Sequence, residues 1–176
     1  MKEVKNHLNR IIKQLSWSAL LMFAPLSSGL ADTPANPKVS IQISPNTDRA
    51  TILGSPQLFT GHVLVDMLFT PNEAAKHSAG VVAFSPGARS NWHSHPGGQH
   101  LVVTSGTGWV QEWGGEKKQI KAGDVIWTPP GVKHWHGATD KTAMTHYAIQ
   151  TQVEGKTVNW LEAVTNTQYH TPTSSQ

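Results

Sequence analysis

NWHSHPGGQH, residues 91–100, places three histidines, a glutamine and two glycines within ten positions. His93 and His95 are two residues apart. Because successive side chains of a β-strand alternate between its faces, both imidazoles would point to the same side. A second pair with this spacing, His134 and His136, follows the turn sequence PPGVK. The two pairs predict that several imidazoles meet at one place in a β-structure.

The chain around this stretch alternates short β-like segments with turn residues. From Leu58 onward the segments are LFTGHVLVDMLF, AGVVAFSPG, QHLVVTSG, TGWVQEWGG, KKQIKAGDVIWTPPG and TAMTHYAIQTQVEG. Regularly spaced short strands are typical of an all-β sandwich or barrel. The segment VNWLEAVTNTQYH, residues 158–170, has a helical pattern instead. We therefore predict an all-β barrel domain over residues 58–176 with a short C-terminal helix.

The residues before the barrel divide into a leader and an arm. Residues 1–31 combine a basic start, the apolar run LSWSALLMFAPL and small residues at Gly29 and Ala31, which together are typical of a secretory signal peptide. The apolar run is too short to span a bilayer, so we expect cleavage after Ala31, no membrane attachment afterwards, and a periplasmic or secreted protein. Residues 32–57 are rich in Pro, Ser, Thr and Asn and read as an arm with one strand at KVSIQIS, residues 38–44.

Charge and cysteine content exclude several classes of function. The formal net charge of +3 lies entirely in the first 13 residues, since the rest carries ten basic and ten acidic side chains. Nucleic acid is therefore not an expected partner. The chain has no cysteine, so a metal ion here would be held by nitrogen and oxygen. His93, His95 and His134, clustered without carboxylate partners, favour a shared divalent cation over a packed core.

Two motifs resemble those of the cupin superfamily. Gly87, five residues, HSH, three residues, Gln99, six residues and Gly106 match the first motif, with glutamine where glutamate is usual. Gly123, five residues, PPG, two residues and His134 match the second, with Ala138 in place of its closing asparagine. The resemblance implies a cupin double-stranded β-helix, a jelly-roll barrel with one metal ion held by three histidines and a fourth ligand.

The fourth ligand has two candidates within the permitted spacing. Counted along the strand from His93 and His95, Gln99 stays on the inner face while His100 turns outward. The glycines at 97 and 98 could reset this register through a bulge. We prefer Gln99. A neutral amide beside three neutral imidazoles leaves the charge of the cation uncompensated, which favours a Lewis acid over redox chemistry.

A narrower resemblance covers about residues 59–169, which are similar to the small manganese-dependent cupin hydroxynitrile lyases of bacteria. That family cleaves or forms cyanohydrins such as (R)-mandelonitrile, and the resemblance implies Mn²⁺, with Fe²⁺, Zn²⁺ or Ni²⁺ as alternatives. It implies as metal ligands His93, His95, Gln99 and His134. It places His146 and His136 in the pocket, where we expect His146 to act as general base and His136 to hold or reprotonate cyanide. Val82 and Gln150 share the inner faces by strand parity and would shape the substrate pocket.

Three functions remain open on these residues. The first is a carbon–carbon lyase acting on a cyanohydrin or aldehyde, with nitroaldol chemistry as a possible extension. The second is a cupin dioxygenase, and the third is a non-catalytic periplasmic module that binds a metal or small ligand. A homodimer or homotetramer is expected, because small barrels expose sheet edges that a second copy can cover.

Overall fold

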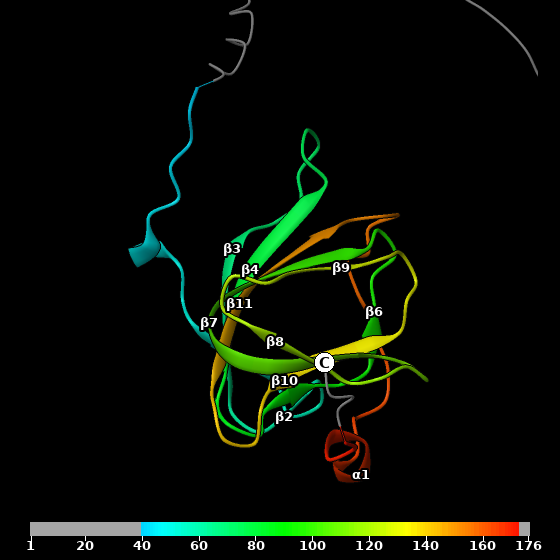
Figure 1. Ribbon diagram of the computed structural model, residues 1–176. Coiled ribbons are helices and arrows are strands. Elements are labelled where there is room, and N and C mark those ends of the chain that lie inside the picture. The colour runs from blue at the N-terminus through cyan, green and yellow to red at the C-terminus, as the bar shows by residue number, and fades with distance from the viewer. Residues whose placement is uncertain (1–39, 173–176) are drawn as a thin grey trace, which may run out of the picture. The chain divides into compact units, whose positions relative to one another are not determined.

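The computed structural model describes residues 40–172, and nearly all of the regular structure in this range is β (Figure 1). The elements are η1 (Asn46–Asp48), β1 (Ile52–Leu53), β2 (Phe59–Thr60), β3 (Val63–Phe69), β4 (His77–Phe84), β5 (Arg89–Ser90), β6 (His93–Ser94), β7 (Gln99–Glu112), β8 (Lys118–Lys121), β9 (Val125–Thr128), β10 (His134–Ala138), β11 (Met144–Thr151), β12 (Asn159–Trp160) and α1 (Asn166–Tyr169). The predicted leader, residues 1–31, lies outside this range, so export stays a prediction. No helix among residues 40–172 is long and apolar enough to cross a membrane.

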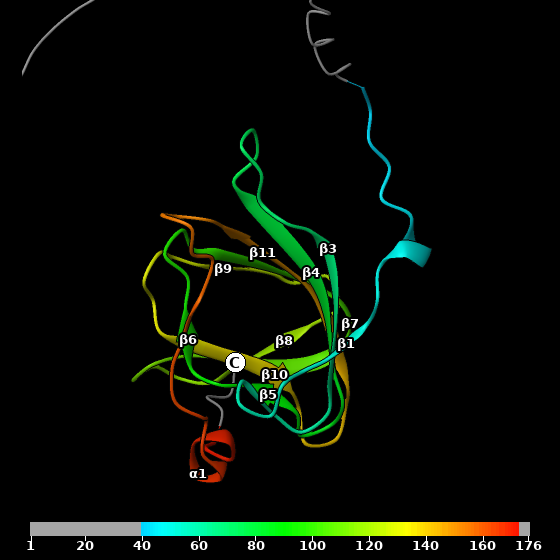
Figure 2. The same cartoon turned by 180° about the vertical axis from the view of Figure 1, so that it is seen from behind.

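The strands curl into a barrel because β7 belongs to two sheets (Figures 1 and 2). Its first half pairs with β11 and β9, and its second half pairs with β10 and β8. The change of sheet falls at Gly106, which has a φ of +75° and where an added Cβ would lie 1.9 Å from the carbonyl oxygen of Ala143. Only glycine fits this bend. The hydrogen-bonded path of strands runs β1-β3-β4-β11-β7-β10-β5-β2, and every pairing between these strands is antiparallel.

Alternation along the strands fills the barrel interior. In β11, Met144, His146 and Ala148 are buried, while Tyr147 between them faces outward. The interior combines an apolar cluster, which includes Val63, Phe84, Leu101, Val103 and Met144, with the histidines described below. A separate cluster of Trp92, Trp135, Val164 and Tyr169 joins the C-terminal segment to the outside of the barrel. Trp92 and Trp135 thus alternate with the inward-facing histidines and pack on the other side of their strands.

At the ends of the chain, the expected arm strand was wrong, and the predicted short C-terminal helix is confirmed over fewer residues than its pattern covered. Residues 40–44, the described part of the predicted arm strand, form no strand, and Ile41 and Ile43 are 93% and 84% exposed. Alternating apolar residues form a strand only when a neighbouring strand accepts their hydrogen bonds. Residues 158–170 are not one helix, since Asn159–Trp160 pairs with β6 and the helix is confined to α1. The helix begins at a capping box between Thr165 and Gln168, a local signal stronger than the apolar stripe before it.

Candidate metal centre and substrate pocket

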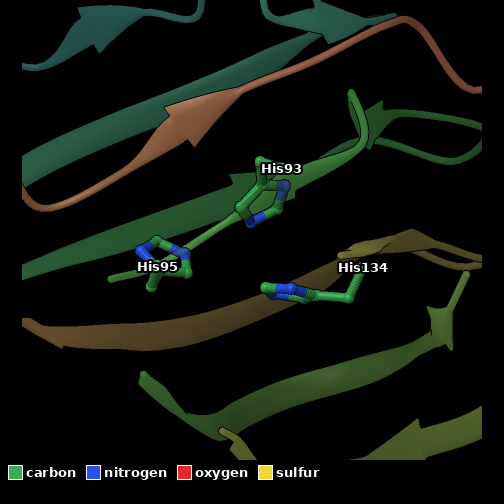
Figure 3. A group of neighbouring side chains, drawn as sticks. All are labelled: His93, His95 and His134. Atoms are coloured by element: carbon green, nitrogen blue, oxygen red, sulfur yellow. The ribbon is translucent and has the colours of Figure 1, made fainter. Parts of the chain in front are cut away.

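Three histidines from two separate segments meet inside one end of the barrel (Figure 3). His93 lies on β6, His95 follows it, and His134 opens β10, directly opposite His93 in the strand pairing. One ring nitrogen of each lies within 4.8 Å of the others, and all three side chains are buried. The structure therefore brings together the three imidazoles that the sequence suggested.

Each of these imidazoles is oriented by a main-chain carbonyl group. Nδ1–H of His93 donates to the oxygen of Asn91 at 2.9 Å, that of His95 to the oxygen of Thr157 at 2.6 Å, and that of His134 to the oxygen of Val132 at 3.1 Å. Because a carbonyl oxygen can only accept, Nδ1 must carry the hydrogen in all three rings. Every Nε2 then has a free lone pair, as a metal ligand requires.

Gln99 lies where it could add a fourth donor to the three histidines. Its Oε1 lies 3.1 Å from Nε2 of His134, and the side chain is buried. Since Nδ1 of His134 carries the hydrogen, both of these atoms present lone pairs, and a cation between them would remove their repulsion. Metal–nitrogen and metal–oxygen bonds are about 2.0–2.2 Å long, so two donor atoms at this spacing could bind the same cation. Nε2 of His95 is buried and has no hydrogen-bond partner in the described part of the chain, which suits a ligand atom directed at a cation.

His100, the other candidate for fourth ligand, lies on the outer face of the barrel. Its side chain is exposed and stacks on Trp127, with ring centroids 4.4 Å apart. The glycines before Gln99 therefore do not reverse the strand register.

Burial keeps the cluster uncharged. Desolvation lowers the pKa of His134 to about 4 and that of His93 well below its ordinary value, with the neighbouring imidazoles lowering the pKa of His93 further. The pKa of His95 is also lowered, again mainly by burial. Neutral imidazoles are the form that binds metal ions, so the folded site is prepared for a cation near neutral pH.

His136 and His146 form a second pair beside the cluster. Nε2 of His146 lies 3.1 Å from Nδ1 of His136, so the two rings share one hydrogen. His136 lines the cavity described next, whereas His146 is fully buried behind it and does not line that cavity. Burial lowers the pKa of His146 to about 4 and that of His136 well below its usual value. A proton could therefore reach His146 from the cavity by way of His136.

A small apolar cavity of about 130 Å³ opens onto the cluster. Its lining includes the predicted pocket residues Val82 and Gln150, and its full lining is Phe59, Val65, Met67, Gly80, Val82, His93, His95, Gln99, His136, Ala148, Gln150, Val158 and Trp160. None of these residues is acidic. The cavity is smaller than the roughly 300–1,000 Å³ of drug-sized sites, so it suits a small, largely apolar molecule.

Sequence reasoning missed the contribution of the C-terminal segment. Thr157 supplies the carbonyl for His95, and Trp160 packs on His93 at a centroid distance of 4.9 Å while also lining the cavity. The helical pattern of residues 158–170 predicted a helix there and gave no indication of these contacts. A main-chain carbonyl leaves no mark in a sequence, so only the fold reveals the role of Thr157.

Comparisons with known proteins agree with this geometry. A family model described as "Cupin domain" matches residues 80–149, a range that contains His93, His95, Gln99 and His134. An (R)-mandelonitrile lyase from Granulicella tundricola is 52% identical over 116 residues, which are 66% of this chain and 88% of that protein. The chain belongs to the cupin superfamily. This cupin is of the same type as that lyase, a relationship that indicates catalytic activity, and its three-histidine cluster indicates a site for a divalent metal ion.

Solved structures confirm the predicted cupin fold. A cupin-like protein from Thermotoga maritima is 44% identical, with a TM-score of 0.66 over 70% of this chain and 94% of its own. A polyketide cyclase from Streptomyces resistomycificus has a TM-score of 0.58 at 14% identity, over 74% of this chain and 91% of its own, and shares the fold alone. The prediction of an all-β jelly-roll barrel is thus confirmed.

Proposed function

We propose that this cupin is a metal-dependent hydroxynitrile lyase that cleaves or forms small cyanohydrins such as (R)-mandelonitrile, with Mn²⁺ as the metal ion. The observation that carries the proposal is the neutral donor set of three imidazoles and one amide, facing an apolar cavity without acidic residues. The similarity to an (R)-mandelonitrile lyase supports the same substrate class. Nitroaldol formation, which also joins a carbanion to an aldehyde, is a natural extension.

The metal ion and the protein have distinct tasks in this reaction. When bound, a divalent cation supplies positive charge that stabilises the negative charge developing as the carbon–carbon bond breaks. The protein supplies the ligands that hold it, with Nδ1 of each histidine fixed by a carbonyl and Nε2 directed inward. Because none of the ligands carries a charge, the protein does not weaken the positive field at the site.

The pair formed by His136 and His146 accepts the hydroxyl proton and later returns it. Cleavage removes the hydroxyl proton, turns the O–H electron pair into the second bond of the carbonyl, and releases the electrons of the carbon–carbon bond with cyanide. His136 lines the cavity and can accept that proton at Nε2, since its Nδ1 is shared with His146. The same pair then returns the proton to cyanide, giving neutral hydrogen cyanide. The lowered pKa of both rings keeps them neutral and able to accept at working pH.

The apolar walls hold the rest of the substrate. Phe59, Val65, Val82 and Trp160 line the cavity beside the cluster and exclude water from it. An aryl or alkyl group attached to the reacting carbon would contact these side chains, while the hydroxyl and nitrile groups lie toward the histidines. Exclusion of water strengthens the electrostatic interactions on which the reaction depends.

The test is metal analysis of the purified protein followed by a cleavage assay with (R)-mandelonitrile, in which benzaldehyde is measured. Manganese-loaded protein is expected to release benzaldehyde, and the His134→Ala variant, which loses a ligand, is expected to be inactive. A fully loaded protein without turnover on any cyanohydrin would support a non-catalytic binding module instead. Oxygen consumption with turnover would identify a dioxygenase.

A further inference from the structure

Gln99 is the first member of a row of polar side chains that runs across three strands. In the strand pairing Gln99 on β7 lies opposite Gln150 on β11, which lies opposite Ser78 on β4. Nε2 of Gln99 donates to Oε1 of Gln150 at 3.5 Å, and Nε2 of Gln150 donates to Oγ of Ser78 at 2.8 Å. At its other end the row reaches Nε2 of His134 through Oε1 of Gln99. The row therefore has one direction, with each amide oxygen nearer to the metal centre than the amide nitrogen beside it.

A glutamine ligand must have its side-chain amide held in one orientation, whereas a glutamate ligand has no such requirement. The two ends of a side-chain amide have nearly the same shape, yet only the oxygen has a lone pair to offer a cation. An amide turned by 180° would point two N–H groups at the ion and repel it. The two oxygens of a carboxylate are equivalent, so a turned glutamate still binds. Glutamine at position 99 can therefore bind a cation in only one of its two amide orientations, whereas glutamate, the usual residue of the motif, can bind in both.

Gln150 favours the orientation of Gln99 that can bind a cation. Its Oε1 can only accept, so it favours the orientation in which Gln99 turns its nitrogen away from the histidines and its oxygen toward them. Ser78 is buried and accepts from Gln150, which holds the Gln150 side chain in place across the sheet. We infer that Gln150 is a positioning residue for the metal centre, which holds the Gln99 amide in the one orientation that can bind a divalent cation. This role rests on the metal site of the proposed function and adds to the part Gln150 plays in lining the cavity.

The test measures metal affinity rather than turnover, by competition between the protein and a chromophoric chelator for Mn²⁺. Gln150→Leu keeps the size of the side chain but removes its acceptor, and it is expected to weaken Mn²⁺ binding by about 10- to 100-fold, the range for lost partners of metal ligands. Gln150→Glu retains an acceptor for Gln99, so it is expected to bind at least as tightly as the parent. Gln152→Leu makes the same chemical change two residues away, outside the cavity lining, and is expected to leave the affinity unchanged.

A second comparison separates orientation of the amide from a general effect on the pocket. In a Gln99→Glu background the ligand has no wrong orientation, so adding Gln150→Leu is expected to change Mn²⁺ affinity by less than about threefold. Equal affinity of the parent and Gln150→Leu would overturn the inference. So would the same loss in the parent and in the Gln99→Glu background, since Gln150 would then act on the site in another way. Thermal unfolding of the metal-free variants checks that each is folded.

Failure of this inference can also be distinguished from failure of the proposed function. Absence of Mn²⁺ binding by the parent protein would contradict the proposed metal centre itself. Binding by the parent without lyase activity would contradict the proposed reaction but leave the role of Gln150 to be decided by the affinities. The spectrum of bound Mn²⁺ in electron paramagnetic resonance gives an independent readout, since replacing the amide oxygen by water changes the ligand field.

Discussion

At the scale of single residues, the metal centre is built from neutral groups whose orientation is fixed by their neighbours. Carbonyl oxygens hold the Nδ1–H of His93, His95 and His134, whereas many metal-binding histidines in proteins are held by carboxylates. A carbonyl fixes the ring without adding a full negative charge. A cation bound there would thus keep the positive field that the proposed Lewis acid needs.

The first prediction concerns the ligands. His93→Ala leaves two imidazoles and an amide, so the purified variant is expected to contain almost no metal by elemental analysis. Gln99→Ala is expected to retain a reduced amount, because three imidazoles remain. His100→Ala serves as the control, since this side chain stacks on Trp127 on the outer face. Equal metal content in all three variants would reject the site.

The second prediction concerns the proton path through the histidine pair. His146→Ala removes the group that shares a hydrogen with His136, and turnover of mandelonitrile is expected to fall by about 10² to 10⁴, the range for a lost acid–base group. Metal content is expected to stay the same, because His146 is not part of the three-histidine cluster. A folded, metal-loaded variant with undiminished cleavage would show that His146 is only a core residue.

The three-histidine cluster could be predicted from the sequence because its side chains stand at fixed strand spacing. His93, His95 and His134 follow from the period of two and the two motifs. The order of His136 and His146 relative to the cavity could not be predicted. Strand parity places both inside the barrel, but only the packing shows that His136 reaches the cavity and His146 lies behind it.

At the scale of elements, β7 and the C-terminal segment decide the shape of the site. The sequence suggested two strands, QHLVVTSG and TGWVQEWGG, where the structure has the continuous β7. Gly106 reads as a turn residue in the sequence, yet here it lets one strand pass from one sheet to the other. Whether a glycine ends a strand or bends it depends on the neighbouring strands, which local pattern does not contain.

The third prediction concerns the strand that closes the pocket. Trp160 on β12 packs against Phe59 at 5.5 Å and His93 at 4.9 Å between ring centroids. Trp160→Ala is expected to lower the free energy of unfolding by about 3 kcal/mol, at the lower end for a truncated core aromatic because the side chain is only partly buried. Urea denaturation measures the change. Leu161→Ala, at an exposed neighbouring position, is the control, and an equal loss in both variants would contradict the packing role of Trp160.

At the scale of the whole molecule, the buried imidazoles couple stability to pH. The pKa values of His134 and His146 are lowered to about 4 by burial, while histidines of an unfolded chain titrate near pH 6.5. Below about pH 6.5 the unfolded state therefore binds more protons than the folded state. The stability of the metal-free protein is expected to be constant above that pH and to fall steadily from there toward pH 4.

Urea denaturation of the metal-free protein at several pH values checks this fourth prediction. His146→Leu, which removes one buried imidazole, is expected to flatten the pH dependence. Stability that rises as the pH falls from 6.5 to 5 would contradict the assignment of neutral buried rings.

The fifth prediction concerns assembly. The outer apolar face, formed by Leu64, Val125, Trp127 and Tyr147 on β3, β9 and β11, is 40% to 64% exposed at these side chains. A large exposed apolar patch commonly marks an interface, and a twofold pairing would cover it on both copies. We expect a homodimer in light scattering and a monomer for Val125→Glu. Gln119→Glu, on β8 of the other sheet, makes the same change in charge and is expected to remain dimeric.

The distance along the chain between the parts of the metal centre has a consequence for when the ion can be acquired. His93 and His134 are far apart in sequence, and the carbonyl that holds His95 comes later still, from Thr157. A growing chain that has not yet reached Thr157 lacks the group that aims His95, so the complete set of donors exists only once this segment has folded against β6. We therefore expect a metal ion to be bound by the folded domain and not by the growing chain, so that the ions available at that stage influence which one is bound.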